Sequence, residues 1–345
     1  MLVISEPSYA QTDWHKNTFS HLKVQARKKR VPLAVATCAE EAAGEGFAFV
    51  LGGSAAWISQ TVAALQSSGC HPIVLTELPE GGIFGRYSCV KTDYARYLHL
   101  LYNRFTRENY RRVAFYGVNH ASLSDLARKE LFLDRFPMGE IFSNDGSLAL
   151  CYEHFAKSHE QDPFDAVVCA NDLAAVSLLH HMGERAQEIG CITVNAATPI
   201  LSYFPSVFAV GVDHAALAVA AFEIAACIEA NPGFIGMRVT VDYCTTEEKE
   251  TTFVPTRQSI STANRIYADG ELDELLRIGR LLSECDETDR KILRLIAQNT
   301  WEIGEETYLS DNGVKYRVKK MKRICDVPSK SDIPRLLGKY GICLE

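Results

Sequence analysis

The segment AVVCANDLAAVSLLHHM, residues 166–182, decides the fold class of this 345-residue chain. Its first five residues, 166–170, are small or β-branched and apolar throughout, which is typical of a strand buried on both faces of a parallel sheet. Asn171 and Asp172 come next, and Asp172–Glu188 has the pattern of a helix. A buried strand followed directly by a helix is the unit from which α/β folds are built.

The same alternation of strand and helix patterns extends through residues 1–255. Strands are expected at Leu2–Ser5, Pro32–Thr37, Ala48–Leu51, Pro72–Thr76, Ser88–Lys91, Val113–Gly117, Gly139–Phe142, Ala166–Ala170, Cys191–Val194 and Val207–Val210. Helices between them include Trp14–Arg30, Trp57–Ser68, Tyr94–Glu108, Leu148–Ser158 and Asp172–Glu188. About ten strands are more than one parallel sheet of this kind usually contains. The sequence therefore predicts two lobes, each with a doubly wound parallel sheet.

Polar and aromatic side chains that directly follow strands are candidate ligand contacts, because doubly wound sheets bind ligands at the carboxyl ends of their strands. If two lobes face each other, the ligand is expected in the cleft between them. The candidates from this argument are Tyr9, Asp13, Trp14, Ser54, Asn171 and Asp172. Two alternatives stay open: each polar residue can instead be a helix N-cap, Asp172 in particular, and Trp14 can be a core residue.

Composition excludes several classes of protein. The chain is 47% apolar and 23% charged, and its length suits two or three domains. It has no apolar run of about 18 residues and no signal sequence, so we expect a cytoplasmic protein with no membrane partner. The 11 cysteines are scattered and include no C-x-x-C pair, which favours free thiols.

The motifs of common enzyme classes are absent from the sequence. There is no P-loop, dinucleotide fingerprint or nucleophile elbow, and the histidines have no metal-ligand spacing. We therefore expect no enzymatic activity, no cofactor and no metal site.

The charge is distributed unevenly along the chain. The net charge is −7, yet residues 310–345 contain nine Lys or Arg and four Asp or Glu, whereas the preceding 309 residues contain 27 and 39. A basic end on an acidic body is typical of a DNA-binding module attached to another domain. The basic run RKKR (27–30) is different, because it lies at the expected end of a helix, where cations interact favourably with the helix dipole.

The basic end contains two amphipathic helical patterns. DETDRKILRLIAQ (286–298) begins with acidic residues and places its apolar residues on one face. In LSDNGVKYRVKKMKRICDVPSKSD (309–332), Val314, Val318, Met321 and Cys325 recur with helical spacing. The cations lie beside this stripe or at other exposed positions: Lys315, Arg317, Lys319, Lys320, Lys322 and Arg323. A helix over 311–325 would therefore have one buried apolar face and one exposed cationic face, as a DNA-recognition helix requires.

Five segments carry a resemblance to a known family: ISQTVAALQSSGCHPIVLTELP (58–79), YSCVKTDYARYLHLLYNRFTRENYRRVAFYG (87–117), RKELF (128–132), AVVCANDLAAVSLLHHM (166–182) and TFVPTRQSIS (252–261). In order and spacing they resemble the lactose-repressor (LacI/GalR) family over residues 1–261. The resemblance implies a periplasmic-binding-protein-like sensor of a small effector, with Arg128 and Asn171 at effector-holding positions. The chain begins at strand one, without the family's N-terminal DNA-binding domain, and ITVNAAT (192–198) lacks an acidic pair typical of the family. The missing acidic pair leaves two alternatives: the effector is a small polar or anionic metabolite other than a sugar held by a carboxylate, or the cleft has lost its ligand.

The basic end resembles a second family, the LuxR-type (NarL-type) helix-turn-helix domain. ETDRKILRLIAQ and LSDNGVKYRVKKMKRICDVPSKSDI carry this resemblance, which implies an all-α domain over 284–345. The resemblance implies that Asn312, Lys315, Tyr316 and Lys319 contact DNA. We add Lys320 and Arg323 as two further cations expected to contact DNA. Gly313 and Arg317 depart from the family pattern, and Gly313 weakens the helix.

Within residues 262–283, Leu272, Leu275, Leu276, Gly279 and Leu282 recur with helical spacing. This stripe predicts either a linker or dimerisation helix or a helix that packs on its own C-terminal domain. A homodimer is expected because paired DNA half-sites need two readers. The sequence as a whole predicts a transcription regulator that senses a small molecule and binds double-stranded DNA. The alternative is a small-molecule-binding or scaffolding protein whose C-terminal domain binds protein.

Overall fold

A computed structural model describes residues 1–344 apart from positions 37, 43, 77–82, 121, 197–198, 235 and 246–268. The segment TFVPTRQSIS and residues 262–268 of the expected linker lie outside the described residues. The chain divides into two compact units. The first comprises Met1–Arg111, Asn119–Gly139 and Val210–Glu250, and the second comprises Arg112–Val118, Glu140–Ala209 and Thr251–Glu345.

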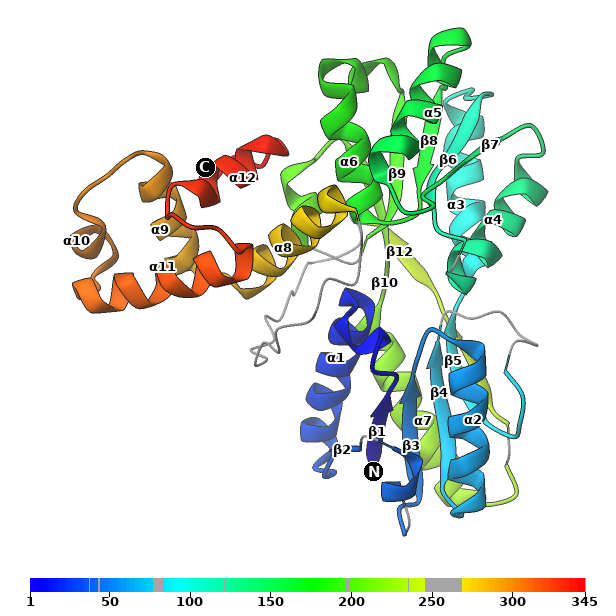
Figure 1. Cartoon of the computed structure of the whole chain (residues 1–345). Helices are drawn as coiled ribbons and strands as arrows, with labels where there is room; N and C mark the ends of the chain where they lie inside the picture. The colour runs from blue at the N-terminus through cyan, green and yellow to red at the C-terminus, as the bar shows by residue number, and fades with distance from the viewer. Residues whose placement is uncertain are drawn as a thin grey trace. The chain divides into compact units, whose positions relative to one another are not determined.

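The first sheet is six-stranded, with the order β11-β5-β4-β3-β1-β2 (Figure 1). Its strands are β1 (Leu2–Ser5), β2 (Ala34–Ala36), β3 (Phe47–Leu51), β4 (His71–Thr76), β5 (Ser88–Thr92) and β11 (Arg238–Val241). Every pair of neighbours is parallel. Val3 of the central strand β1 aligns with Val35 on one side and Phe49 on the other.

Helices cover both faces of this sheet, because alternate residues of its strands are buried on opposite sides. Val50 of β3 belongs to a buried cluster with Ile58 and Val62 of α2 (Ala55–Ser67). Its neighbour Phe49 instead contacts Phe222 of α7 (His214–Ala230), with ring centroids 5.0 Å apart. Helix α1 (Asp13–Lys29) packs beside α7.

The second sheet is also six-stranded, with the order β12-β10-β9-β8-β6-β7. Its strands are β6 (Val113–Val118), β7 (Glu140–Ser143), β8 (Ala166–Cys169), β9 (Cys191–Ala196), β10 (Val207–Val212) and β12 (Tyr243–Thr245). Strands β7, β6, β8 and β9 are parallel neighbours, whereas the edge strand β12 is antiparallel to β10. The predicted α/β fold with two mainly parallel sheets is confirmed, with β11 and β12 as additional edge strands.

Helices α5 (Leu148–Gln161) and α6 (Asp172–Met182) pack on the second sheet and on each other. Gly117 of β6 permits a close approach of α6: it has φ +82°, and a Cβ there would lie 2.5 Å from the Cβ of Ala174. The expected helix 172–188 ends earlier, because Gly183 has φ +56° and a 3₁₀ segment, Gly183–Glu188, follows. Helices α3 (Tyr94–Arg107) and α4 (Leu123–Arg135) pack together in the first unit.

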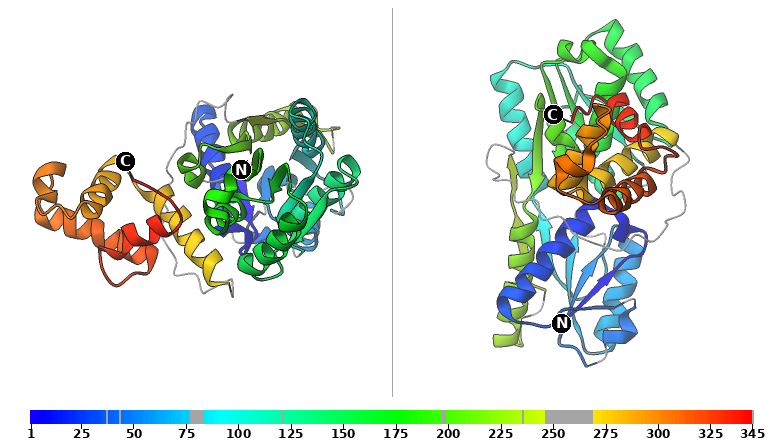
Figure 2. Two further views of the ribbon diagram at one scale, coloured as in Figure 1. Left: turned by 90° about the horizontal axis from the view of Figure 1, so that it is seen from above. Right: turned by 90° about the vertical axis from the view of Figure 1, so that its left-hand side faces the viewer.

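The helices after residue 269 form what we call the C-terminal module, residues 269–344 (yellow to red in Figure 1). It consists of α8 (Gly270–Glu284), α9 (Glu287–Ala297), α10 (Ile303–Thr307), α11 (Asp311–Cys325) and α12 (Asp332–Lys339). Both views of Figure 2 show these helices as one cluster.

Helix α8 joins this module to the rest of the second unit. It contacts α5 and α6 on one side and α11 and α12 on the other. Leu275, Ile278 and Leu281 of α8 are fully buried in a hydrophobic cluster that extends from the second sheet into the module. The helix expected within 262–283 therefore begins at Gly270 and is part of a packed core.

Candidate functional site

The segments that follow β1 and β3 are joined by Glu6, a residue that the sequence analysis did not single out. The Glu6 carboxylate accepts hydrogen bonds from the backbone N–H groups of Gly53, at 2.8 Å, and Ser54, at 3.0 Å. A Cβ on Gly53 would lie 2.8 Å from the ring of Tyr9, so only glycine fits there without displacement. Glu6 is therefore a site residue whose partners, 47 and 48 residues away, the local sequence could not reveal.

Two predicted aromatic residues lie together after β1. The ring centroids of Tyr9 and Trp14 are 5.7 Å apart, and Trp14 also contacts His214 edge-on at 5.9 Å. Trp14 is only 8% exposed, and its buried indole N–H has no hydrogen-bond partner among the described residues. Buried indole N–H groups usually have a partner, so this donor is suited to an added acceptor.

Helix caps account for several of the other predicted residues. Ser54 caps α2 by accepting from Trp57 N–H at 3.4 Å. Asn171 caps α6 by accepting from Ala174 N–H at 3.0 Å. Asp172 is therefore not the N-cap of α6, which corrects that alternative, and its side chain is buried. Asp13 is the first residue of α1, whose N-cap is Thr12.

Arg128 lies on α4 in a buried ion pair within the first unit. Its guanidinium contacts the carboxylate of Asp125 at 2.6 Å, and both side chains are buried. The same carboxylate accepts from the backbone N–H of Asn119 at 3.1 Å. The charge of Arg128 is therefore compensated by the protein itself. Removing either partner would leave an uncompensated buried charge, which is strongly destabilising.

A buried histidine lies near the Tyr9 ring. His15 forms a 2.7 Å hydrogen bond with the hydroxyl of Ser5, and its ring centroid is 6.3 Å from that of Tyr9. Burial, reinforced by the charges of Lys16 and Lys23, lowers the pKa of His15 from 6.5 to about 4. His15 is therefore neutral at physiological pH.

This pKa predicts a pH dependence of stability. Because the folded pKa of His15 is lower than the unfolded one, its contribution is complete above pH 6.5 and is lost as the pH falls towards 4. When the pH is lowered from 6.5 to 4, the free energy of unfolding of the wild type should fall more than that of His15→Gln, as measured by chemical denaturation. The expected difference is up to about 3 kcal/mol. Parallel pH profiles of the two proteins would show that His15 is not buried in its neutral form.

A second candidate surface lies on the C-terminal module. On α11, Val314, Val318, Met321 and Cys325 pack into the hydrophobic core, as predicted. The opposite side is exposed and carries five of the six predicted DNA-contacting residues: Asn312, Lys315, Tyr316, Lys319 and Arg323. We call these five residues the α11 face. Tyr316 on this face is 74% exposed.

Two cations of α11 lie elsewhere, and their predicted exposure is corrected. The guanidinium of Arg317 contacts Asp286 at 2.9 Å and Asp289 at 2.8 Å, which joins α11 to the first turn of α9. The ammonium of Lys320 contacts the carboxylate of Glu284 at 3.5 Å and its carbonyl oxygen at 3.3 Å. Both side chains are held against neighbouring helices because acidic groups, which helical periodicity alone does not place, lie beside them.

Other kinds of site are not found in the part of the chain that the structure describes. There, no group of three or more His, Cys, Asp or Glu side chains could hold a metal ion, and no helix is both long and apolar enough to cross a membrane. All ten cysteines whose side chains are described are free thiols, as expected.

Comparison with known proteins shows the fold. The sequence matches no protein-family model and no curated protein. Three solved structures are similar over 71% of this chain. A LacI family transcriptional regulator from Enterococcus faecalis with bound ribose has 14% identity and TM-score 0.57, with 96% of its chain covered. The transcription regulator CcpA of Lactococcus lactis has 13% identity and TM-score 0.54, also with 96% covered. A sugar transporter from Clostridium phytofermentans has 11% identity and TM-score 0.53, with 97% covered. The chain therefore has the two-unit α/β fold of these proteins, with an additional helical region at its C-terminal end.

Proposed function

We propose that this chain is a ligand-responsive transcription regulator that binds double-stranded DNA through the α11 face. The observation that carries the proposal is the sidedness of α11. Its apolar residues pack into the core, whereas Lys315, Lys319 and Arg323 extend from the exposed side together with Asn312 and Tyr316. Lys and Arg bind phosphates, and an amide such as that of Asn312 can hydrogen-bond base edges.

The local geometry supports insertion of α11 into a groove. Ser310 caps the helix by accepting from Gly313 N–H at 3.2 Å, so its first turn is formed despite the glycine. The ion pairs of Arg317 and Lys320 hold α11 against neighbouring helices, whereas the α11 face remains exposed to solvent. A helix that packs on its domain with one side and exposes cations on the other resembles the recognition helix of a LuxR-type helix-turn-helix domain.

The two sheets support the sensor part of the proposal. Tyr9 and Trp14 follow the carboxyl end of β1, where they provide two aromatic rings and the buried indole N–H donor of Trp14. Asn171 is exposed and directly follows β8 in the second sheet. Similar proteins have been solved with ribose or lactose bound. We propose that Tyr9 and Trp14 in the first unit, and Asn171 in the second, are each available to contact a small polar metabolite, and that the regulator acts as a homodimer on paired half-sites.

DNA binding is tested with the purified chain and fragments of its own upstream region over a salt series. We expect affinity to fall steeply with salt, because binding Lys and Arg releases counterions from DNA. Absence of binding even at low salt would reject the DNA-binding part of the proposal. Thermal shift with ribose, lactose and a panel of polar metabolites tests the sensor part separately, and a sensor is expected to gain stability with at least one compound.

One observation favours a second candidate function, in which the module binds a protein. Trp301 and Tyr308, on either side of α10, are both 95% exposed. Glu302, Glu305 and Glu306 between them are also exposed, and such an acidic surface opposes DNA phosphates. Exposed aromatic residues are typical of protein interfaces. A chain that fails to bind DNA at low salt would favour this alternative.

A further inference from the structure

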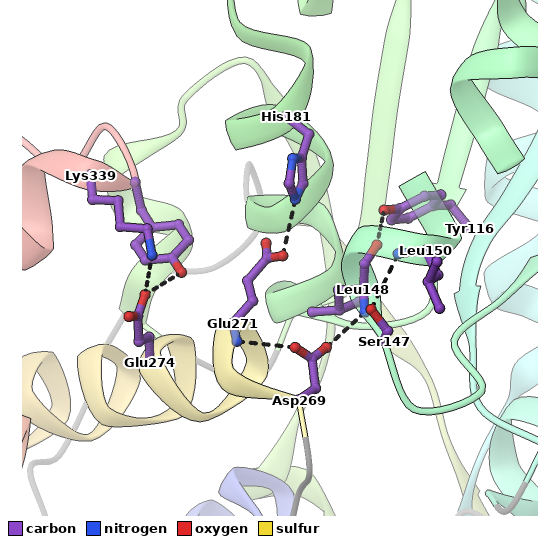
Figure 3. Close-up of polar contacts among 10 residues, drawn as sticks. Tyr116, Ser147, Leu148, Leu150, His181, Asp269, Glu271, Glu274 and Lys339 are labelled. Carbon is purple, nitrogen blue, oxygen red and sulfur yellow. Dashed lines mark hydrogen bonds and ion pairs between the residues drawn. The ribbon is translucent and has the colours of Figure 1, made fainter. Parts of the chain in front are cut away.

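The first turn of α8 is attached to the second sheet's helices by one carboxylate (Figure 3). Asp269 is the N-cap of α8, where one of its oxygens accepts from Glu271 N–H at 3.0 Å. Its other oxygen accepts from the backbone N–H of Leu148, the first residue of α5, at 2.7 Å. Asp269 thus satisfies the free N–H groups of two helices that lie 121 residues apart in sequence.

The C-terminal end of α6 contacts the same turn. His181 forms a 3.0 Å hydrogen bond with the carboxylate of Glu271, and its ring stacks on Tyr152 of α5 at 4.8 Å. The other carboxylate oxygen of Glu271 is buried without a hydrogen-bond partner among the residues described, so His181 is its main polar support. The adjacent His180 packs on the ring of Tyr340, whose hydroxyl donates to Glu274 of α8 at 2.7 Å.

Helix α6 therefore joins a candidate ligand contact to the C-terminal module. Its N-cap is Asn171, at the carboxyl end of β8, and its last turn carries His180 and His181. Eleven residues of helix span about 16 Å and move as a nearly rigid rod. The close contact at Gly117 and Ala174 seats its first turn on β6, so the position of this turn depends on the end of β6.

We propose that Asp269, Glu271 and His181 form a latch that fixes the C-terminal module on the rest of the second unit, and that α6 couples this latch to the state of its Asn171 end. The proposal rests on the proposed function in one respect: a ligand at Asn171 would then alter how firmly the α11 face is held. Allostery requires such an element, on whose equilibrium both sites act.

Hydrogen exchange of the full-length protein tests the latch without knowledge of the ligand. We expect His181→Ala and Glu271→Ala each to raise exchange in the first turns of α8 by about ten-fold, because each removes one side of a partly buried hydrogen bond. The double variant should add little to either single variant. Matched controls are His154→Ala and Glu153→Ala, two exposed residues of α5. Exchange equal to that of the controls would overturn the latch.

A separate variant tests the coupling along α6. Asn171→Ala removes the N-cap at the distant end of the helix, and we expect it to raise exchange in the first turns of α8 by about five-fold. Ser122→Ala, which removes the N-cap of α4 in the first unit, is the matched control. Faster exchange confined to the first turn of α6 would overturn the coupling and leave the latch intact.

These measurements do not depend on DNA. If the wild type binds its upstream fragment, the latch variants should bind it about ten-fold more weakly, because a loosely held module loses the fixed placement that paired sites require. Unchanged affinity would overturn the regulatory role of the latch. If the wild type binds no DNA, the proposed function fails while the exchange data still decide the latch.

Discussion

Replacing Lys315, Lys319 and Arg323 together with alanine is expected to lower DNA affinity by roughly a thousand-fold at low salt. All three side chains are exposed on one side of α11, away from the apolar residues that pack into the core. Their removal should therefore leave the fold unchanged and take away phosphate contacts. Electrophoretic mobility shift or fluorescence anisotropy on the upstream fragment measures the loss.

The salt dependence makes this prediction more specific. If all three cations contact phosphates, the slope of log K against log salt should decrease in magnitude by roughly 2.7, or about 0.9 for each contact. The matched control removes the same charge from α1 through Arg27→Ala, Lys28→Ala and Lys29→Ala, which are all exposed. An α11 variant that binds like the parent, or a control that weakens binding as much, would mean that α11 is not the reader.

Replacing Ile278 with alanine is expected to destabilise the second unit by about 2–5 kcal/mol, since it leaves a cavity in a close-packed core. Ile278 is fully buried, and it belongs to the cluster that extends from the second sheet into the C-terminal module. We expect the thermal midpoint of the second unit to fall by roughly 5–15 °C, measured by calorimetry.

The choice of control separates burial from the loss of side-chain volume. Leu150 of α5 belongs to the same unit but is 55% exposed, so Leu150→Ala should change the midpoint little. A small effect of Ile278→Ala would show that α8 does not pack as described. The module would then be a tethered domain, as the basic end of the sequence alone suggested.

Ten of the twelve described strands could be predicted, most readily where they are continuous apolar runs, as at 166–170. The edge strands β11 and β12 could not. In Arg238–Val241, exposed residues alternate with less exposed ones, and Tyr243–Thr245 is only three residues long. Edge strands have fewer neighbours, so their hydrophobic signal is weak. The alternative of an N-cap role holds for Asn171 rather than for Asp172, because α6 begins at Asp172 and its cap is the preceding residue.

The candidate site was predictable where it depends on local pattern. Helical spacing was sufficient to separate the α11 face from the apolar stripe. Helical spacing did not predict the position of Lys320. Its ammonium group forms an ion pair with Glu284, which belongs to another helix and therefore does not enter the pattern of α11. Asp269 was missed for the same reason, since its second partner is the distant Leu148.

The carboxylate of Glu6 has a consequence for which metabolites the first sheet can accept. The N-terminal end of a helix, with its free N–H groups, is where many α/β proteins bind phosphate. Directly before α2, the N–H groups of Gly53 and of the N-cap residue Ser54 are already bonded to a carboxylate supplied by the chain itself. A phosphorylated compound would have to displace this built-in anion and would meet like-charge repulsion. If the proposed sensor binds its metabolite here, we therefore expect the loop before α2 to disfavour phosphate esters and to accept the uncharged, hydroxyl-bearing part of a metabolite.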